Sequence, residues 1–201
     1  MKLKFYFIIL VSFIFVNCKN KTPQTTTDNY EKTLVDRENK SAAKQTNETG
    51  ELQKTIVFEV KADPKDFEDG IQPWASIENA KTDLPNLIKK DEIVILDHNI
   101  SVIIDYPLTN IYKFETSSKK GFTREMLLME IRNHYYKLYD DEEKSASKKT
   151  LPMEKRTMYN RNETNGKYGI WGHDIADLVL TDIQVYKTSD GKIVLTLGID
   201  S

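Results

Sequence analysis

The feature that most limits how this chain can fold is a polar stretch, residues 19–54, with too few apolar side chains to bury a core. It is rich in Thr, Asn, Lys and Glu, and its charges nearly balance. Segments of this composition stay solvated and flexible. We therefore expect a disordered tether over residues 18–54. The single folded domain should cover residues 55–201, which is long enough for one core.

The chain opens with an apolar run from Phe5 to Val16, preceded by Lys2 and Lys4. This run has 12 residues, whereas a helix that spans a membrane needs roughly 20. A basic start followed by a short apolar run is typical of a secretory signal. We predict that residues 1–17 are a signal peptide and that the mature protein lies outside the cytoplasm.

Cys18 is the only cysteine, and it stands where the apolar run ends. This arrangement resembles a bacterial lipoprotein box. The resemblance implies that the cysteine is diacylated and becomes the mature N-terminus, and two acyl chains suffice for stable anchoring. It predicts a lipid-anchored protein of the cell envelope, at the outer membrane, that faces either the periplasm or the surface. The alternative is an ordinary signal peptide followed by an incidental cysteine.

Composition also bears on partners and cofactors. Residues 55–201 hold more acidic than basic side chains, which argues against nucleic acid as a partner. If Cys18 is acylated, no thiol remains for a disulfide or a metal. The three histidines are His98, His134 and His173, and none has a second ligand at metal-site spacing. We expect no metal and no cofactor.

Short β-branched runs predict the strands. In residues 55–62 the alternation places Ile56, Phe58 and Val60 on one face. A first hairpin is expected across the turn-forming triplet Asp97-His98-Asn99. The strands expected beyond residue 62 are 93–96 and 100–104 in that hairpin, and 177–187 and 192–199 in a second hairpin across residues 188–191. Residues 111–116 are a further candidate strand.

One long helix is expected from about Arg124 to Glu143. Thr123 can cap it, and Phe122 and Leu127 occupy the two staple positions. The residues that follow helical spacing are Leu127, Leu128, Ile131, Tyr135, Leu138 and Glu142. A weaker helix, interrupted by Pro85, is expected over 77–89. Together these elements predict an α+β fold in which an antiparallel sheet of hairpins packs against one long helix.

The acidic run Asp140 to Glu143 stands at the end of this helix, where the macrodipole disfavours negative charge. We attribute the run to pairing with the basic segment next to it. The candidate partners are Lys148, Lys149, Arg156 and Arg161. His134 lies on the shoulder of the apolar face, which favours a packing role.

The stretch GKYGIWGHDIADL, residues 166–178, allows two interpretations. As a packed turn, it would bury Trp171 against the long helix and fix His173 and Asp174 by hydrogen bonds to backbone. As a functional site, it would gather two groups of side chains in one cleft. The ligand-binding candidates are Tyr168, Trp171 and Arg161, and the catalytic candidates are His173, Asp174 and Asp177, since an imidazole beside carboxylates can act as a base.

The segments 121–143, 160–180 and the closing GKIVLTLGIDS resemble a family of small bacterial and plant domains that share a YGIWGHDxxDLxL-type block. The resemblance implies that the helix, the basic loop and the last hairpin form one unit. It supplies no catalytic residue.

No complete catalytic constellation occurs in the sequence. We therefore favour a binding or interaction module for an unidentified protein or small-molecule ligand. The alternative is a metal-independent hydrolase that uses His173 and Asp174.

The lipoprotein interpretation makes a direct prediction. Labelled palmitate should enter the wild-type protein in growing bacterial cells and should not enter Cys18→Ala, because the thiol is the acylated atom. Gel autoradiography of the purified proteins measures the label in wild type and in Cys18→Ala. Equal incorporation into the two proteins would contradict the assignment.

Overall fold

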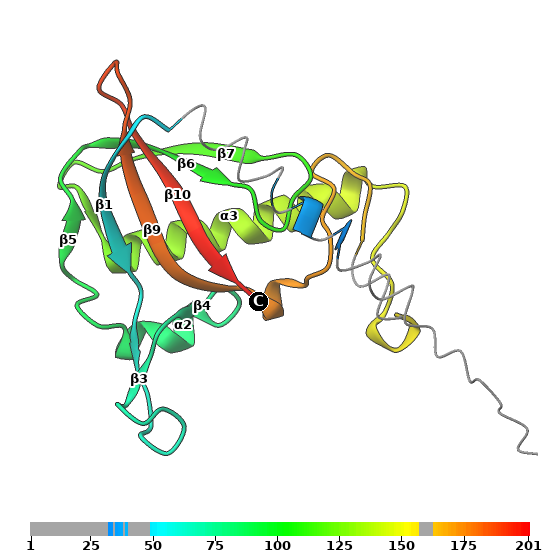
Figure 1. The fold of residues 1–201 in the computed structure, drawn as a ribbon, viewed down its shortest axis with the longest axis horizontal. Coiled ribbons are helices and arrows are strands. Elements are labelled where there is room, and N and C mark those ends of the chain that lie inside the picture. The colour runs from blue at the N-terminus through cyan, green and yellow to red at the C-terminus, as the bar shows by residue number, and fades with distance from the viewer. Residues whose placement is uncertain (1–31, 34, 38, 40–48, 157–162) are drawn as a thin grey trace, which may run out of the picture.

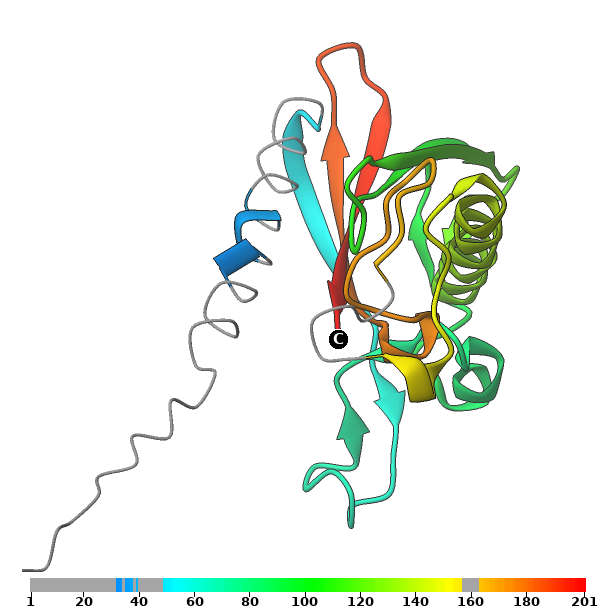
Figure 2. The ribbon, with the colours of Figure 1, turned by 90° about the vertical axis from the view of Figure 1, so that its right-hand side faces the viewer.

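The computed structural model describes residues 32–33, 35–37, 39, 49–156 and 163–201. The described chain forms two layers, a twisted sheet and the long helix α3 (Arg124–Ser145), which lies against one face of the sheet (Figures 1 and 2). This arrangement confirms the predicted α+β class, with hairpins packed on one helix.

The principal sheet has the strand order β1–β9–β10–β6–β7, and a short strand, β4, pairs with β9. Its strands are β1 (Glu51–Val57), β4 (Ala75–Ser76), β6 (Asn99–Ile104), β7 (Tyr112–Ser117), β9 (Val179–Lys187) and β10 (Ile193–Asp200). Two small sheets join β2 (Val60–Lys61) to β3 (Ile71–Gln72) and β5 (Ile93–Ile95) to β8 (Phe122–Thr123).

The hairpin predicted near the end of the sequence is confirmed. β9 and β10 are antiparallel neighbours. The turn between them is closed by the Thr188 N–H, which donates to the Lys192 carbonyl at 2.9 Å. Gly191 adopts a φ of +83°, a left-handed conformation that suits glycine.

The hairpin predicted across residues 97–99 is wrong. β5 pairs with β8, and β6 pairs with β7 on one side and β10 on the other. A strand has only two hydrogen-bonding edges, so β6 has none left for β5. Because β6 and β10 run parallel, the sheet is mixed rather than wholly antiparallel.

Helix α3 follows its prediction closely. Its N-cap is Thr123, whose hydroxyl accepts from the Met126 N–H at 3.2 Å. Its buried residues are Leu127, Leu128, Ile131, Tyr135, Leu138 and Glu142, the same face that the spacing predicts. The weaker helix is shorter than expected: α2 spans Ala80–Asp83, and the 3-10 turn Leu84–Asn86 comes next, at Pro85.

The domain begins earlier than the expected residue 55, because β1 starts at Glu51 and pairs with β9. Residues 51–55 are exposed, so they carry no apolar alternation from which a strand could be predicted. Within the expected tether, residues 32–33, 35–37 and 39 are helical, and Arg37 lies 2.7 Å from Glu163. Cys18 and the predicted signal peptide lie outside the described residues.

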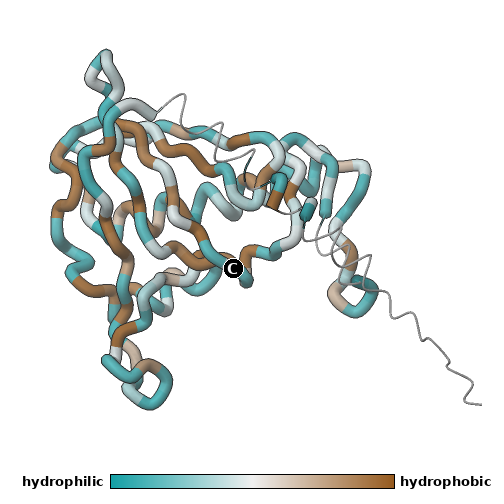
Figure 3. The backbone as a smooth tube through the Cα atoms, in the orientation of Figure 1, coloured by the Kyte–Doolittle hydropathy of each residue, from teal (hydrophilic) through white to brown (hydrophobic). Residues whose placement is uncertain are grey.

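The core lies between the sheet and α3. Ile56, Phe58 and Val60 are all buried, as their alternation predicts. Apolar residues follow the central strands (Figure 3). Among the described residues, no helix is both long and apolar enough to cross a bilayer.

Candidate functional site

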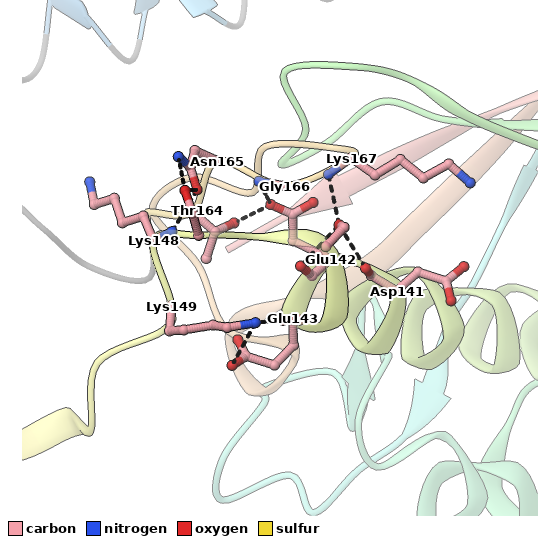
Figure 4. A network of polar contacts seen from close by, with 11 residues as sticks. Asp141, Glu142, Glu143, Lys148, Lys149, Thr164, Asn165, Gly166 and Lys167 are labelled. Carbon is pink, nitrogen blue, oxygen red and sulfur yellow. Dashed lines mark hydrogen bonds and ion pairs between the residues drawn. The ribbon is translucent and has the colours of Figure 1, made fainter.

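The segment that contains the GKYGIWGHDIADL stretch is held by one buried side chain, Glu142, in the last turn of α3 (Figure 4). Its Oε1 accepts from the Thr164 hydroxyl and from the Gly166 N–H, both at 2.6 Å. Its Oε2 accepts from the N–H groups of Tyr168 at 2.7 Å and Gly169 at 3.2 Å. One carboxylate therefore fixes a loop that lies more than 20 residues away in the sequence.

These contacts set the charge of Glu142. Burial alone raises the pKa of the carboxyl group, but the hydrogen bonds from Thr164 and from the N–H groups of Tyr168, Gly166 and Gly169 outweigh burial and lower the pKa below its ordinary value. Glu142 is therefore ionised at neutral pH, and within the described part of the chain its charge is balanced by hydrogen-bond dipoles.

Two glycines allow the loop to approach this closely. A Cβ on Gly166 would lie 2.6 Å from Ser145 Oγ and 2.8 Å from the Ala146 nitrogen. Gly169 adopts a φ of +63°, and its carbonyl accepts from the Thr109 hydroxyl at 2.9 Å. Larger residues would force the loop away from the carboxylate.

The acidic run is thus only partly explained by the pairing that we expected. Lys149 does lie near Glu143, at 3.9 Å. Lys148 instead contacts Glu163 at 3.1 Å. Among the described residues, the donors to Glu142 are the Thr164 hydroxyl and backbone N–H groups, and the predicted partner Arg161 lies outside the described residues. A signal for this role was present, since helical spacing places Glu142 on the buried face.

Trp171 is buried, with 1% of its surface exposed, as the packed-turn interpretation predicts. Its ring forms a T-shaped contact with the Tyr106 ring at a centroid distance of 5.1 Å, and the centroid of the His173 ring lies 6.2 Å away. Its backbone N–H donates to the Pro107 carbonyl at 3.1 Å. The indole N–H has no acceptor among the described residues.

His173 lies beside two hydroxyl groups that the sequence did not connect with it. Its Nε2 is 2.9 Å from the Tyr106 hydroxyl and 3.4 Å from Ser201 Oγ. The two hydroxyl groups are themselves 2.9 Å apart. Tyr139 of α3 donates its hydroxyl hydrogen to the His173 carbonyl at 2.9 Å. Contacts from three separate parts of the fold therefore position His173, two to its ring and one to its carbonyl.

The two aspartates are engaged in local structure. The Asp174 carboxylate forms an ion pair with Arg156. The Asp174 N–H donates to Asp177 Oδ2 at 2.9 Å, which fixes the start of the 3-10 turn Ile175–Asp177. The Asp174 carboxylate is therefore engaged by a cation, whereas a hydrolytic His173 would need a carboxylate that orients its ring. Among the described residues, no three His, Cys, Asp or Glu side chains gather as metal ligands would.

Tyr168 lines a surface hollow of about 450 Å³ between β7, α3 and the loop at residue 167. Its lining residues are Ile111, Tyr112, Lys113, Phe114, His134, Lys137, Lys167 and Tyr168, and we call it the lysine hollow. Two ligand-binding candidates, Tyr168 and Trp171, are thus both buried, and Tyr168 also lines a hollow. The third, Arg161, lies outside the described residues.

The wall of the lysine hollow is rigid. The His134 ring stacks on Phe114 at 3.5 Å with an interplanar angle of 8°, and its Nδ1 lies 2.6 Å from the Tyr112 hydroxyl. These contacts confirm the packing role predicted for His134. Burial, and next the nearby Lys137, lowers the pKa of His134, so the imidazole is neutral at pH 7.

Comparison with protein-family models, with curated proteins and with solved structures gave no match. The resemblance to bacterial and plant domains therefore stays a prediction.

The burial of Trp171 predicts a large effect on stability. Trp171→Ala should lower the free energy of unfolding by about 3 to 5 kcal/mol, as truncation of large buried aromatics does. His173→Ala should cost about 1 to 3 kcal/mol, because the partly buried Tyr106 hydroxyl loses a hydrogen-bond partner. Urea unfolding measures both, and Trp74→Ala, at a partly buried tryptophan, is the control with the smaller loss. A Trp171→Ala protein as stable as wild type would instead favour a ligand cleft.

Glu142→Gln should lower the free energy of unfolding by about 3 kcal/mol at pH 7, because the amide turns an N–H donor toward backbone donors that need an acceptor. Glu143→Gln is the matched control and should leave stability nearly unchanged, since Glu143 is half exposed.

The stability difference between wild type and Glu142→Gln should also depend on pH. The pKa of Glu142 is lowered in the folded state, so its contribution is complete above the unfolded value of about 4.3 and is lost as the pH falls through the lower folded value. The stability gap between wild type and Glu142→Gln should therefore stay constant from pH 7 to about pH 5 and narrow in more acidic solution. Urea unfolding across this pH range measures the gap. A gap that widens in acid would contradict the lowered pKa of Glu142.

Proposed function

We propose that this protein is a lipid-anchored, extracytoplasmic binding module. The observation that supports it best is the engagement of the polar groups in the GKYGIWGHDIADL stretch. Asp174 pairs with Arg156, Asp177 accepts from backbone, and the loop N–H groups donate to Glu142. These groups hold a loop in place, which is the role of a scaffold that presents a surface rather than of a reacting centre.

A preformed hollow beside this scaffold fits the proposal. The lysine hollow, with its volume of about 450 Å³, is within the range of small-molecule sites, about 300 to 1,000 Å³. Its aromatic wall is fixed by ring contacts, such as the Tyr112–Tyr168 edge contact at 5.4 Å. A rigid wall loses little entropy when a ligand binds.

The location is inferred from the lipoprotein box at Cys18. We place the mature protein in the cell envelope, attached to the outer membrane by its acyl chains. Residues 19–48 would then separate the domain, which starts near β1, from the bilayer surface. A tether of this length lets one domain search for ligands or partners near the membrane.

A metal-independent hydrolase is the second candidate, and one contact favours it. Ser201 Oγ lies 3.4 Å from His173 Nε2, a distance that could tighten to that of a nucleophile and its base in a complex. Against it stands Asp174, which pairs with Arg156 and leaves the imidazole without an orienting carboxylate from that residue.

An esterase assay separates the two candidates. The purified protein and Ser201→Ala should hydrolyse p-nitrophenyl acetate at the same background rate, because Ser201 is not a nucleophile in a binding module. Ser201 is exposed, so its replacement should leave the fold intact, and Ser118→Ala serves as the matched control. Turnover that falls at least about a hundredfold in Ser201→Ala alone would reject the binding module and favour the hydrolase.

A further inference from the structure

Two lysines from separate elements place ammonium groups at the lysine hollow. Lys137 comes from α3 and Lys167 from the loop that Glu142 holds. Lys113 also lines the hollow from β7, but strand alternation directs its side chain to the face opposite Tyr112 and Phe114. Lys137 and Lys167 are far apart in the sequence, so only the folded chain gathers their charge. Their convergence on one concave surface is the first reason to regard the hollow as a site.

The acidic groups nearby neutralise this charge only in part. Asp141 lies 3.8 Å from Lys137 Nζ, and Glu130 lies 3.9 Å from His134 Nε2. Both distances exceed those of a close ion pair. The ammonium of Lys167 instead lies over the Tyr168 ring, 5.0 Å from its centroid, and Lys137 lies 5.7 Å from the Tyr112 centroid. Both cations therefore keep hydrogen-bond donors for a further partner.

The walls add no competing charge. The rings of Tyr112, Phe114 and Tyr168 are almost fully buried and hold the base of the hollow. His134 stacks on Phe114 and is fixed by Tyr112, so it does not swing into the space. The chemistry offered to a ligand is thus a set of lysine ammonium groups on long, mobile stems above a rigid apolar base.

We propose that the lysine hollow binds a small ligand through a carboxylate or phosphate group. The proposal rests on the binding function proposed above and names the ligand class for it. Ammonium groups recognise compact oxyanions as point charges, and the flexible stems of lysine tolerate either geometry. The hollow is larger than a lone phosphate needs, so the rest of the ligand would lie against Tyr112 and Tyr168.

Calorimetry on the full lipidated protein in non-ionic detergent tests the proposal, with citrate and inorganic phosphate as probes. Wild type should bind at least one of them saturably, and sodium chloride should weaken the binding. Lys137→Gln combined with Lys167→Gln should weaken it at least about tenfold. Replacing both lysines by arginine should restore most of the affinity, because the charge returns.

Lys148→Gln combined with Lys149→Gln is the matched control. It removes the same charge from the neighbouring loop, but both residues lie outside the hollow and contact Glu163 and Glu143. Its affinity should stay within about twofold of wild type, since distant exposed charges are screened. Equal weakening by the two double variants would overturn the site, and so would a wild type that binds neither anion.

A lipid headgroup offers the same phosphate chemistry as a soluble anion. Adding phosphatidylglycerol to the micelles distinguishes these sources: displacement of the bound probe identifies the headgroup as a ligand of the same site, and unchanged affinity identifies a soluble acid. Both results support an oxyanion site.

The two experiments distinguish failure of the anion site from failure of the proposed binding function. Ser201-dependent turnover would reject the binding module, whereas the calorimetric result concerns the lysine hollow, which neither Ser201 nor His173 lines. Equal loss of anion affinity in the two double lysine variants would reject the anion site and leave the binding module in place.

Discussion

The structure depends on a carboxylate placed where helix electrostatics alone would not favour it. Glu142 lies in the last turn of α3, near the negative end of the helix dipole, and it is buried. The loop at residues 164–169 compensates by directing three N–H groups and one hydroxyl at its two oxygens. Hydrogen bonds to a charged acceptor are stronger than those between neutral groups, and leaving the charge without them would be costly.

The carboxylate also determines where the chain beyond residue 164 lies. The loop is hydrogen-bonded to the segment before β7. The Thr109 N–H donates to the Tyr168 carbonyl at 3.0 Å, and Leu108 and Ile170 form an isolated antiparallel β-bridge. From α3, Tyr135 donates to the Tyr106 carbonyl at 2.8 Å. Helix, loop and sheet edge are thereby joined around the buried Trp171. The GKYGIWGHDIADL stretch is a structural junction in which the aromatic side chains fill space and the polar groups form hydrogen bonds.

The junction separates two kinds of polar group. Those inside it, such as Glu142 and Asp177, have partners within the fold. Those outside, such as Lys137 and Lys167, line the lysine hollow, and the same loop forms part of its wall. A ligand that bound there would contact the loop directly, so the stability of the junction would bear on affinity. This physical link connects the packing role of the stretch to the proposed binding role.

The sequence by itself determined the local features. Helical spacing fixed the extent and buried face of α3, the turn residues fixed the β9–β10 hairpin, and alternation placed Ile56 and Phe58 inside, because each depends on neighbours within a few residues. Only the tertiary structure decided the rest. The partner of β5, the role of Glu142 and the contact between Tyr106 and His173 each join distant segments. Pairing between such segments depends on which strand edges and hydrogen-bond donors the whole fold leaves available, and no periodicity within one segment encodes that.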